Sequence, residues 1–442
     1  MTTTSYKMNR LSIAHLLLTT IIAGILIGSC KKNDPPGNNQ VSFYSSDVLD
    51  KWMTMQLRLM KNATGIPNQA FSRHYVYAGI AAVESVAPGL PAHSNWYRNW
   101  NGLTGLPASH HSVNYYYPAN VNGAMAFINK ALFPNATNAD KLAIDSLEAA
   151  LNEGFLATKS QALIARSSEY GKAVAAAVFN WSESDGYKNA GNPYTPPVGA
   201  GLWKPTPLAF ANAVSPYWGN NRTVINGSID NIQPGAPVTY STHSNSAFYQ
   251  MVKQVYDVSL TLTNDQMAMA MFWRDVPGVT SPGHWLSILQ QVIRQNNTRL
   301  DKAVLAYALI GAAINDGLIS CWKTKYHYNV VRPITYIREI MGYPSWNSYI
   351  GTPAHPEYSS GHAALSGAAA AAFEKLFGNI GSFTDHTYDY LGFAPRTYTS
   401  FAAIAEEAAK SRLYGGIHYQ PSLDAGLSEG RKVTANIFSK IK

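Results

Sequence analysis

The chain has 442 residues, of which 46% are hydrophobic and 14% are charged, so it can bury a large core and is not a disordered polymer. Its net charge is +8, but the basic residues are scattered, and no run is longer than Lys31-Lys32. This distribution argues against a nucleic-acid-binding protein, whose basic residues gather on one face. The length fits one large domain or two or three smaller ones.

The first 29 residues have the composition of a targeting segment. Lys7 and Arg10 precede an apolar run at 11–27, and small residues stand directly before Cys30. This order resembles a bacterial lipoprotein signal peptide at 1–29, although a single transmembrane anchor is the alternative. The resemblance implies a chain that is lipidated at Cys30 and held to the bacterial cell envelope, facing the periplasm. The polar, Pro- and Gly-rich residues at 30–44 then predict a tether.

Helical periodicity dominates the rest of the chain. The pattern predicts helices at 46–61, 69–86, 121–132, 138–156, 160–181, 246–259, 265–274, 286–295, 300–322, 362–377, 401–414 and 424–441. No segment shows a convincing strand alternation. The fold class is therefore expected to be all-α, with helices packed as bundles and joined by long irregular loops.

Composition divides the chain into two helical regions. Residues 45–297 are expected to form an N-terminal region containing a long loop at 183–244, which is rich in Gly, Pro, Asn and aromatic residues. Such a loop either shapes a channel or serves as a structural belt. Residues 298–442 are expected to form a C-terminal region. Its helix at 300–322 is apolar on most faces and should be central.

Three motifs in the C-terminal region carry residues suited to binding a tetrahedral anion. They are Lys325 with Arg332-Pro333, Ser360-Gly361-His362 at the start of an Ala-rich helix, and Arg412 with His418. A helix start offers free N–H groups and the positive end of the helix dipole. Arg makes multidentate contacts with oxyanions, Lys adds a point charge, and His serves as nucleophile, ligand or acid–base group. Together the motifs predict a phosphate or vanadate site.

The order and spacing of these motifs resemble the oxyanion site shared by the vanadium-dependent haloperoxidases and the type 2 phosphatidic acid phosphatases. Two looser elements resemble the bacterial haloperoxidase-like branch, namely Trp203-Lys204-Pro205-Thr206-Pro207 and Pro282-Gly283-His284-Trp285. The resemblance implies an all-α fold of helical bundles. It also implies an oxyanion site made by Lys325, Arg332, Ser360, Gly361 and Arg412.

The resemblance leaves two enzyme classes open. In a haloperoxidase, His418 would bind the vanadium of a vanadate cofactor, and His362 would handle peroxide protons while hydrogen peroxide oxidises a halide. In a phosphatase, His418 would become phosphorylated and His362 would protonate the leaving group of a phosphate ester. One site serves both because vanadate imitates the transition state of phosphoryl transfer. We favour the haloperoxidase and keep the phosphatase as the alternative, with an oxyanion-binding protein without turnover as the third. Nothing in the sequence indicates the oligomeric state.

Two positions depart from the family pattern. Ser359 stands where the family usually has Pro before Ser-Gly-His, and we expect this change to loosen the turn. Ser422 stands where the family often has Asp, four residues after the final His. Asp424 is a candidate substitute that fixes the ring of His418, and a backbone carbonyl is the other possibility.

Two further residues are candidates for supporting roles. His355, five residues before Ser360, stands near a position where haloperoxidases of the bromide type tend to have His. It predicts bromide rather than chloride as the preferred halide, unless it is only a loop residue. Asp316, on the predicted helix at 300–322, is a candidate buried partner for an Arg or a His.

Overall fold

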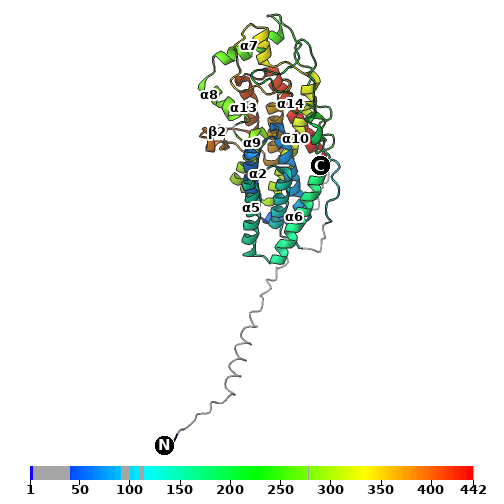
Figure 1. Ribbon diagram of the computed structural model, residues 1–442, viewed down its shortest axis with the longest axis vertical. Helices are drawn as coiled ribbons and strands as arrows, with labels where there is room; N and C mark the ends of the chain where they lie inside the picture. The colour runs from blue at the N-terminus through cyan, green and yellow to red at the C-terminus, as the bar shows by residue number, and fades with distance from the viewer. Residues whose placement is uncertain (3–39, 91–99, 109–113, 277, 442) are drawn as a thin grey trace.

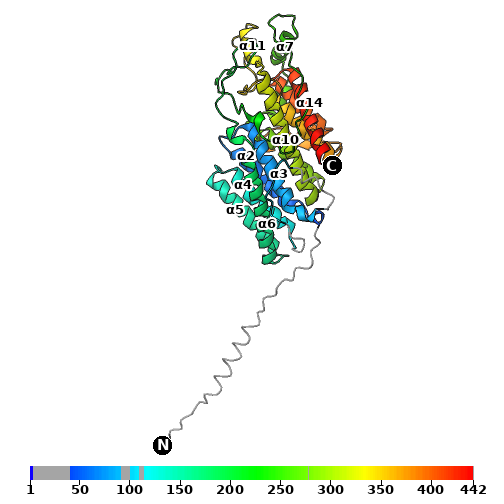
Figure 2. The ribbon, with the colours of Figure 1, turned by 90° about the vertical axis from the view of Figure 1, so that its right-hand side faces the viewer.

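The protein consists of two groups of helices that share one long central helix, α10 (Figures 1 and 2). The computed structural model describes residues 1–2, 40–90, 100–108, 114–276 and 278–441. Cys30, the predicted signal peptide from residue 3 onward and the predicted tether up to residue 39 lie outside the described residues.

The first group of helices comprises α2 (Asp47–Asn62), α3 (Phe71–Val86), α4 (Tyr117–Leu132), α5 (Asn138–Leu156) and α6 (Gln161–Ser182). The remaining helices are α7 (Ala247–Leu260), α8 (Asn264–Phe272), α9 (Thr280–Gln295), α10 (Leu300–Tyr328), α11 (Pro333–Glu339), α12 (Gly361–Phe377), α13 (Phe401–Tyr414) and α14 (Gln420–Lys440). Strands β1 (Phe383–Asp385) and β2 (Arg396–Tyr398) form a two-stranded antiparallel sheet. The all-α prediction is therefore confirmed, with this small sheet as its one departure in the described residues.

Most predicted helices agree with the structure to within a few residues, and the exceptions have physical causes. Helix α9 begins at Thr280, six residues earlier than predicted, because Pro282 lies in its first turn, where the missing N–H is not needed. The short helix α11 was missed, although Pro333 at its first position is a typical helix start. Strands β1 and β2 have three residues each, too few to show an alternation.

Helix α10 positions the functional half of the molecule. It packs against α3 on the side of the first group and against α12 and α14 on the other (Figure 2). It is long and apolar enough to cross a membrane, but 94% of its apolar window is buried inside the protein. The predicted boundary at 297/298 falls just before α10, and this division into two regions stays a prediction.

Helices α12 and α14 approach each other closely because glycines face the neighbouring backbone. A Cβ atom at Gly430 would lie 2.0 Å from the carbonyl oxygen of Ala364, and one at Gly367 would lie 2.6 Å from that of Leu427. Because α12 is rich in Ala, its small side chains also allow the backbone of α14 to approach closely. This contact fixes the N-terminal end of α12, where Ser360-Gly361-His362 lies.

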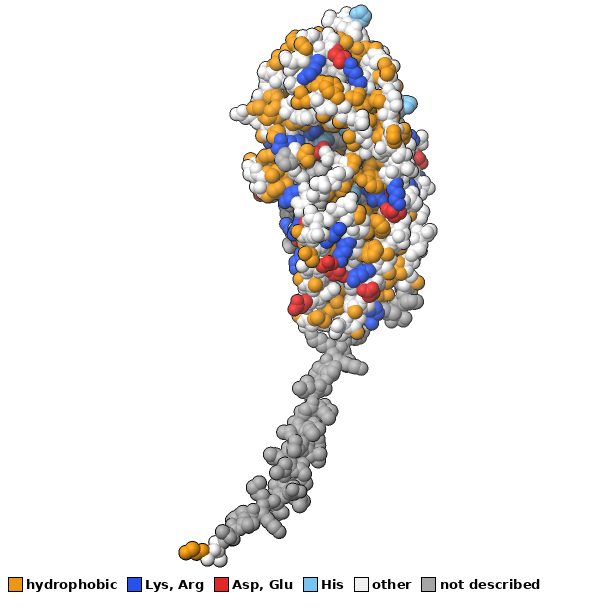
Figure 3. Space-filling view, in the orientation of Figure 1, with side chains coloured by type: hydrophobic (Ala, Val, Ile, Leu, Met, Phe, Trp, Pro, Cys, Tyr) orange, Lys and Arg blue, Asp and Glu red, His pale blue; other side chains and the backbone are white. Residues whose placement is uncertain are grey.

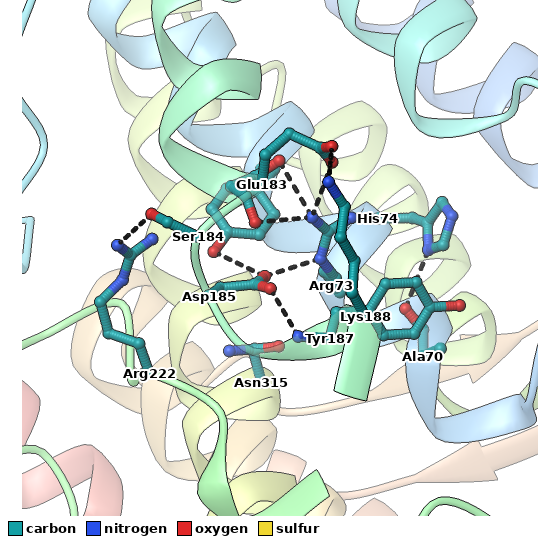
Figure 4. A network of polar contacts seen from close by, with 12 residues as sticks. Ala70, Arg73, His74, Glu183, Ser184, Asp185, Tyr187, Lys188, Arg222 and Asn315 are labelled. Carbon is teal, nitrogen blue, oxygen red and sulfur yellow. Dashed lines mark hydrogen bonds and ion pairs between the residues drawn. The ribbon is translucent and has the colours of Figure 1, made fainter. Parts of the chain in front are cut away.

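The long irregular segment after α6 is tied to the core by buried carboxylates. Asp185 accepts a hydrogen bond from Arg73 Nε at 2.6 Å, as Figure 4 shows. It also accepts from the Tyr77 hydroxyl at 3.0 Å. Further along, the carboxylate of Asp316 on α10 accepts from the backbone amides of Val224 and Ile225. Asp316 is fully buried, as predicted, but its partners are loop groups and the adjacent Asn315 rather than an Arg or a His. Its role is to anchor the loop.

The visible surface carries no segregated charge. On the face drawn in Figure 3, Lys and Arg side chains are interspersed with Asp and Glu among hydrophobic and other polar groups.

Candidate active site

The three sequence motifs meet at one end of α10, beside a cavity of about 520 Å³. Lys325 comes from the last turn of α10, Arg332 directly precedes α11, and Arg412 comes from the last turn of α13. All three cations are buried. Gly361, His362, Arg412 and His418 line the cavity together with His355. Residues that are up to 93 positions apart in the sequence thus form one site, as the motif spacing predicted.

Backbone carbonyls hold the cations in place. Lys325 Nζ donates to the carbonyl oxygens of Pro356 and Glu357, each at 3.0 Å. Arg332 Nε donates to the carbonyl of His355, and its Nη1 donates to that of Ile417, each at 2.8 Å. These acceptors carry no net charge, so they fix the side chains without neutralising them.

The site without an anion is electrostatically unfavourable. Burial lowers the pKa of Lys325 to about 8 and the pKa values of Arg332 and Arg412 to about 10. Arg412 Nε is buried and has no hydrogen-bond partner in the described part of the chain. A buried donor without a partner and three neighbouring cations both favour an anionic ligand. The residues present therefore fit a vanadate or phosphate group.

His418 is oriented by a carboxylate that sequence reasoning missed. Its Nδ1 lies 2.7 Å from Glu357 Oε1, which also accepts from the backbone amide of Tyr419. A guanidinium only donates, and Arg332 Nη1 faces His418 Nε2 at 3.3 Å, so Nε2 keeps its lone pair and Nδ1 carries the proton. Burial raises the pKa of Glu357 to about 7, and Glu357 accepts the hydrogen bond from Nδ1–H. Glu357 is the only acidic residue between Glu339 and Glu374, and that isolation was the signal available in the sequence.

The structure corrects the assignment of Asp424 as the partner of His418. Asp424 is exposed on α14 and accepts a hydrogen bond from Gln420 of the same helix. The backbone-carbonyl alternative is also wrong, because the Nδ1 contact is with the Glu357 side chain. The reason is geometric: Asp424 lies one turn into α14, where it points to solvent.

Ser359 does not loosen the turn before α12. It is fully buried, and its hydroxyl donates to Glu429 Oε2 of α14 at 2.6 Å. The other oxygen of Glu429 accepts from Ser320 and Thr324 of α10. Three hydroxyls from two segments thus converge on one carboxylate, which holds the approach to Ser360 in place. Ser360 itself caps α12, and its backbone N–H donates to the carbonyl of Ser422.

His362 also lines the cavity and is held through its Nε2. This atom is 2.6 Å from the Ser281 hydroxyl and 3.0 Å from the carbonyl oxygen of Trp273. Ser281 in turn donates to Asp275 Oδ1. Burial, followed by the nearby Arg412, lowers the pKa of His362 to about 3, so the ring is neutral. A carbonyl oxygen only accepts, which places the proton on Nε2 and leaves Nδ1 as the basic atom.

His355 is part of the site and not a remote loop residue. Its Nδ1 accepts from Arg332 Nη2 at 2.9 Å, and its ring lies 5.0 Å from that of Trp322. Burial and the adjacent cations Lys325 and Arg332 hold its pKa well below the usual range. A neutral His355 therefore borders the cavity next to the cations.

The carbonyl oxygen of Trp273 connects the two sides of the site. It accepts from both His362 Nε2 and Arg412 Nη1, the latter at 2.9 Å. The indole ring of Trp273 stacks on His284 at 4.2 Å, and His284 Nε2 is 2.6 Å from Asp385 Oδ2. The Pro282-Gly283-His284-Trp285 element noted in the sequence thus packs against Trp273, whose carbonyl oxygen accepts from His362.

Comparisons with known proteins agree with this geometry. A family model described as the VCPO second helical-bundle domain matches residues 305–442. The crystal structure of the first bacterial vanadium-dependent iodoperoxidase is 31% identical to this chain and superposes with a TM-score of 0.80. That match covers 92% of this chain and 98% of the other.

Two structures of bacterial vanadium-dependent chloroperoxidase share the fold at lower similarity. Both are 17% identical to this chain, with TM-scores of 0.63 for the holo form and 0.62 for the apo form. Each match covers 85% of this chain, and 92% and 94% of the other chains, respectively. A search of curated proteins found no match.

Proposed function

Because the chain belongs to the vanadium-dependent haloperoxidase family, we propose that it oxidises halide with hydrogen peroxide at a vanadate group held by His418. The observation that carries this proposal is the tautomer of His418. Glu357 accepts a hydrogen bond from Nδ1–H, which leaves the Nε2 lone pair facing Arg332. A neutral imidazole with a free Nε2 is the form that binds a metal.

The other residues of the site would hold the vanadate oxygens. Lys325, Arg332 and Arg412 supply charge, while Ser360 and the backbone of Gly361 supply hydrogen bonds at the start of α12. When bound, vanadate supplies an electron-poor centre that polarises hydrogen peroxide for attack by halide without changing its own oxidation state. Phosphate has the same shape and charge pattern and fits the same residues.

His362 would serve as the acid–base group. Its Nε2 is occupied by Trp273 and Ser281, so Nδ1 is the atom that takes a proton from hydrogen peroxide and returns it to the leaving oxygen. The low pKa of His362 without an anion rises when an anion binds beside it, because the negative charge favours the imidazolium. Anion binding thus brings the pKa of His362 closer to neutral pH, where the ring can both take up and release a proton.

We further propose that bromide is preferred over chloride. The support is His355, a neutral ring bonded to Arg332 at the edge of the cavity. The similarity to a bacterial iodoperoxidase makes iodide a second halide to test, since iodide is oxidised more easily than bromide.

The test is halide oxidation by protein reconstituted with vanadate. Wild type should brominate an indicator phenol in the presence of hydrogen peroxide, and His418→Ala and His362→Ala should not. The phosphatase alternative rests on the same Nε2 lone pair acting as a nucleophile. It predicts turnover of p-nitrophenyl phosphate and a trapped phosphohistidine at His418. Phosphatase activity without halide oxidation would overturn the haloperoxidase proposal, and tight anion binding with neither activity would indicate a binding protein.

The cellular location also stays a proposal. We propose that the mature chain begins at Cys30, carries a lipid there, and faces the periplasm, on the strength of its N-terminal sequence. Metabolic labelling with a radioactive fatty acid tests this, with Cys30→Ser as the control. Equal labelling of both proteins would contradict it.

A further inference from the structure

One methionine lies in the wall of the active-site cavity. Met271, on the last turn of α8, lines the cavity together with His355, His362 and His418. Its side chain packs against the small cluster formed by Ile350 and Ile417, and Ile417 directly precedes His418. Met271 therefore borders the space in which the proposed reaction takes place.

The sulfur of Met271 contacts a cation that also lines the cavity. Arg274 Nη1 lies 3.4 Å from Met271 Sδ, and Arg274 Nε is buried without a hydrogen-bond partner in the described residues. A thioether is a weak acceptor, so this guanidinium lacks a strong one. An oxygen atom added to the sulfur of Met271 would give Arg274 a strong hydrogen-bond acceptor.

The same helix carries two methionines in a different setting. Met267 and Met269 are partly buried, as Met271 is, but they are not part of the cavity wall. Met53, Met55, Met60 and Met125 are buried in the core. Among the described methionines, Met271 alone combines partial exposure with a place in the cavity wall.

We propose that Met271 is a turnover-dependent oxidation site that intercepts hypohalous acid before it leaves the cavity. The inference rests on the proposed haloperoxidase function, which supplies the oxidant. The sulfur is oxidised by two electrons to the sulfoxide and takes up the oxygen atom of hypohalous acid, whose halogen is reduced to halide while one proton is released. Nothing else is consumed, and methionine sulfoxide reductases reverse the change.

Oxidation at this position changes the cavity wall. The sulfoxide is polar and chiral, so it packs less well against Ile350 and Ile417. Its oxygen is a strong acceptor for Arg274, which would be drawn toward α8. We therefore expect turnover to reduce activity progressively, and Met271→Leu to resist that loss while starting at a rate similar to that of wild type.

A single tryptic peptide tests the proposal. Cleavage after Lys253 and Arg274 releases residues 254–274, which contain all three methionines of α8. Vanadate-loaded protein is run with hydrogen peroxide, bromide and excess indicator phenol, which consumes hypobromous acid that reaches the bulk solution. Fragment-ion spectra should show oxidation at Met271 about 5-fold or more above that at Met267, since only Met271 meets the oxidant inside the cavity.

Three controls complete the test. Hypobromous acid added from outside should oxidise Met267 and Met271 to comparable extents, reactions without bromide should leave both reduced, and Met267→Leu should inactivate as wild type does. Bromination accompanied by equal oxidation of Met267 and Met271 would overturn this inference alone. Absence of bromination in the separate activity assay would overturn the proposed function and this inference with it.

Discussion

The Ser281 hydroxyl lies 2.6 Å from His362 Nε2 and donates to the Asp275 carboxylate. Asp275 itself is 3.8 Å from that nitrogen, too far for a hydrogen bond, so the serine connects the two groups. Burial opposes ionisation of Asp275, but the nearby Arg412 cation and the hydrogen bonds from Ser281 lower its pKa, and the carboxylate stays charged. Asp275, Ser281 and His362 Nε2 are thus hydrogen-bonded in series, which leaves Nδ1 as the free ring nitrogen of His362 within the described residues.

Removing the Ser281 hydroxyl should impair proton transfer without weakening the oxyanion site. We expect Ser281→Ala to lower kcat by roughly 10-fold, part of the factor of about 10² or more that a positioned acid–base group supplies. Vanadate affinity should not change. The Trp273 carbonyl still fixes the Nε2–H tautomer of His362 in Ser281→Ala, but the ¹⁵N and ¹H shifts of Nε2–H should move because one acceptor is lost, and Ser281→Thr should restore them. Ser287→Ala, on the same helix, is the matched control, and unchanged Nε2–H shifts in Ser281→Ala would sink this assignment.

Glu357 should control how strongly His418 binds vanadate. Replacing a carboxylate that orients a metal-binding histidine typically costs about 10–100-fold in affinity, and we expect Glu357→Gln to fall in that range. Asp424→Asn is the matched control, because Asp424 is exposed and accepts its hydrogen bond from Gln420 rather than from His418. Vanadate titration by calorimetry measures both. If Asp424→Asn weakened binding as much as Glu357→Gln, the structural assignment would be contradicted.

Anion affinity should fall at high pH because Lys325 loses its charge. Burial sets the pKa of Lys325 at about 8, below its usual 10.5. The ammonium that attracts the anion is therefore present below about pH 8 and lost above it, and affinity should fall by up to about 10-fold per pH unit there. Sulfate is the suitable probe, since its own charge is constant over this range. Lys325→Met should bind sulfate weakly with little pH dependence between pH 7 and 9, and a wild-type profile equally flat would exclude Lys325 as the source.

Glu429 should stabilise both the fold and the turn before α12. Its carboxylate accepts from Ser320, Thr324 and Ser359, so Glu429→Ala leaves three buried hydroxyls without it. Each unsatisfied buried group costs about 1–3 kcal/mol, which predicts a clear drop in the free energy of unfolding by denaturant titration. Glu406→Gln removes a solvent-exposed ion pair with Arg431 and should change stability by less than about 1 kcal/mol. Equal effects of the two changes would contradict this role.

The sequence identified the residues proposed to contact the anion but not the groups that hold those residues in place. Lys325, Arg332, Gly361 and His418 belong to local motifs with recognisable spacing, and helix periods follow from local patterns of apolar residues. The partner of His418 was missed because Glu357 is 61 positions away, and only the folded chain brings them together. Ser281 and His362 are 81 positions apart for the same reason. Contacts that form only through tertiary packing produce no periodicity or fixed spacing that could be recognised in the sequence.

The Trp273 carbonyl oxygen accepts hydrogen bonds from both His362 and Arg412. Because one atom holds both side chains, the proposed proton-transfer group and the proposed anion-binding group cannot be repositioned separately at this carbonyl. Under the proposed function, a small shift at the end of α8 would change both peroxide protonation and oxyanion affinity. Variants that alter halide or peroxide kinetics through this helix should therefore show correlated changes in both quantities. That correlation limits the routes by which evolution or engineering can retune this enzyme.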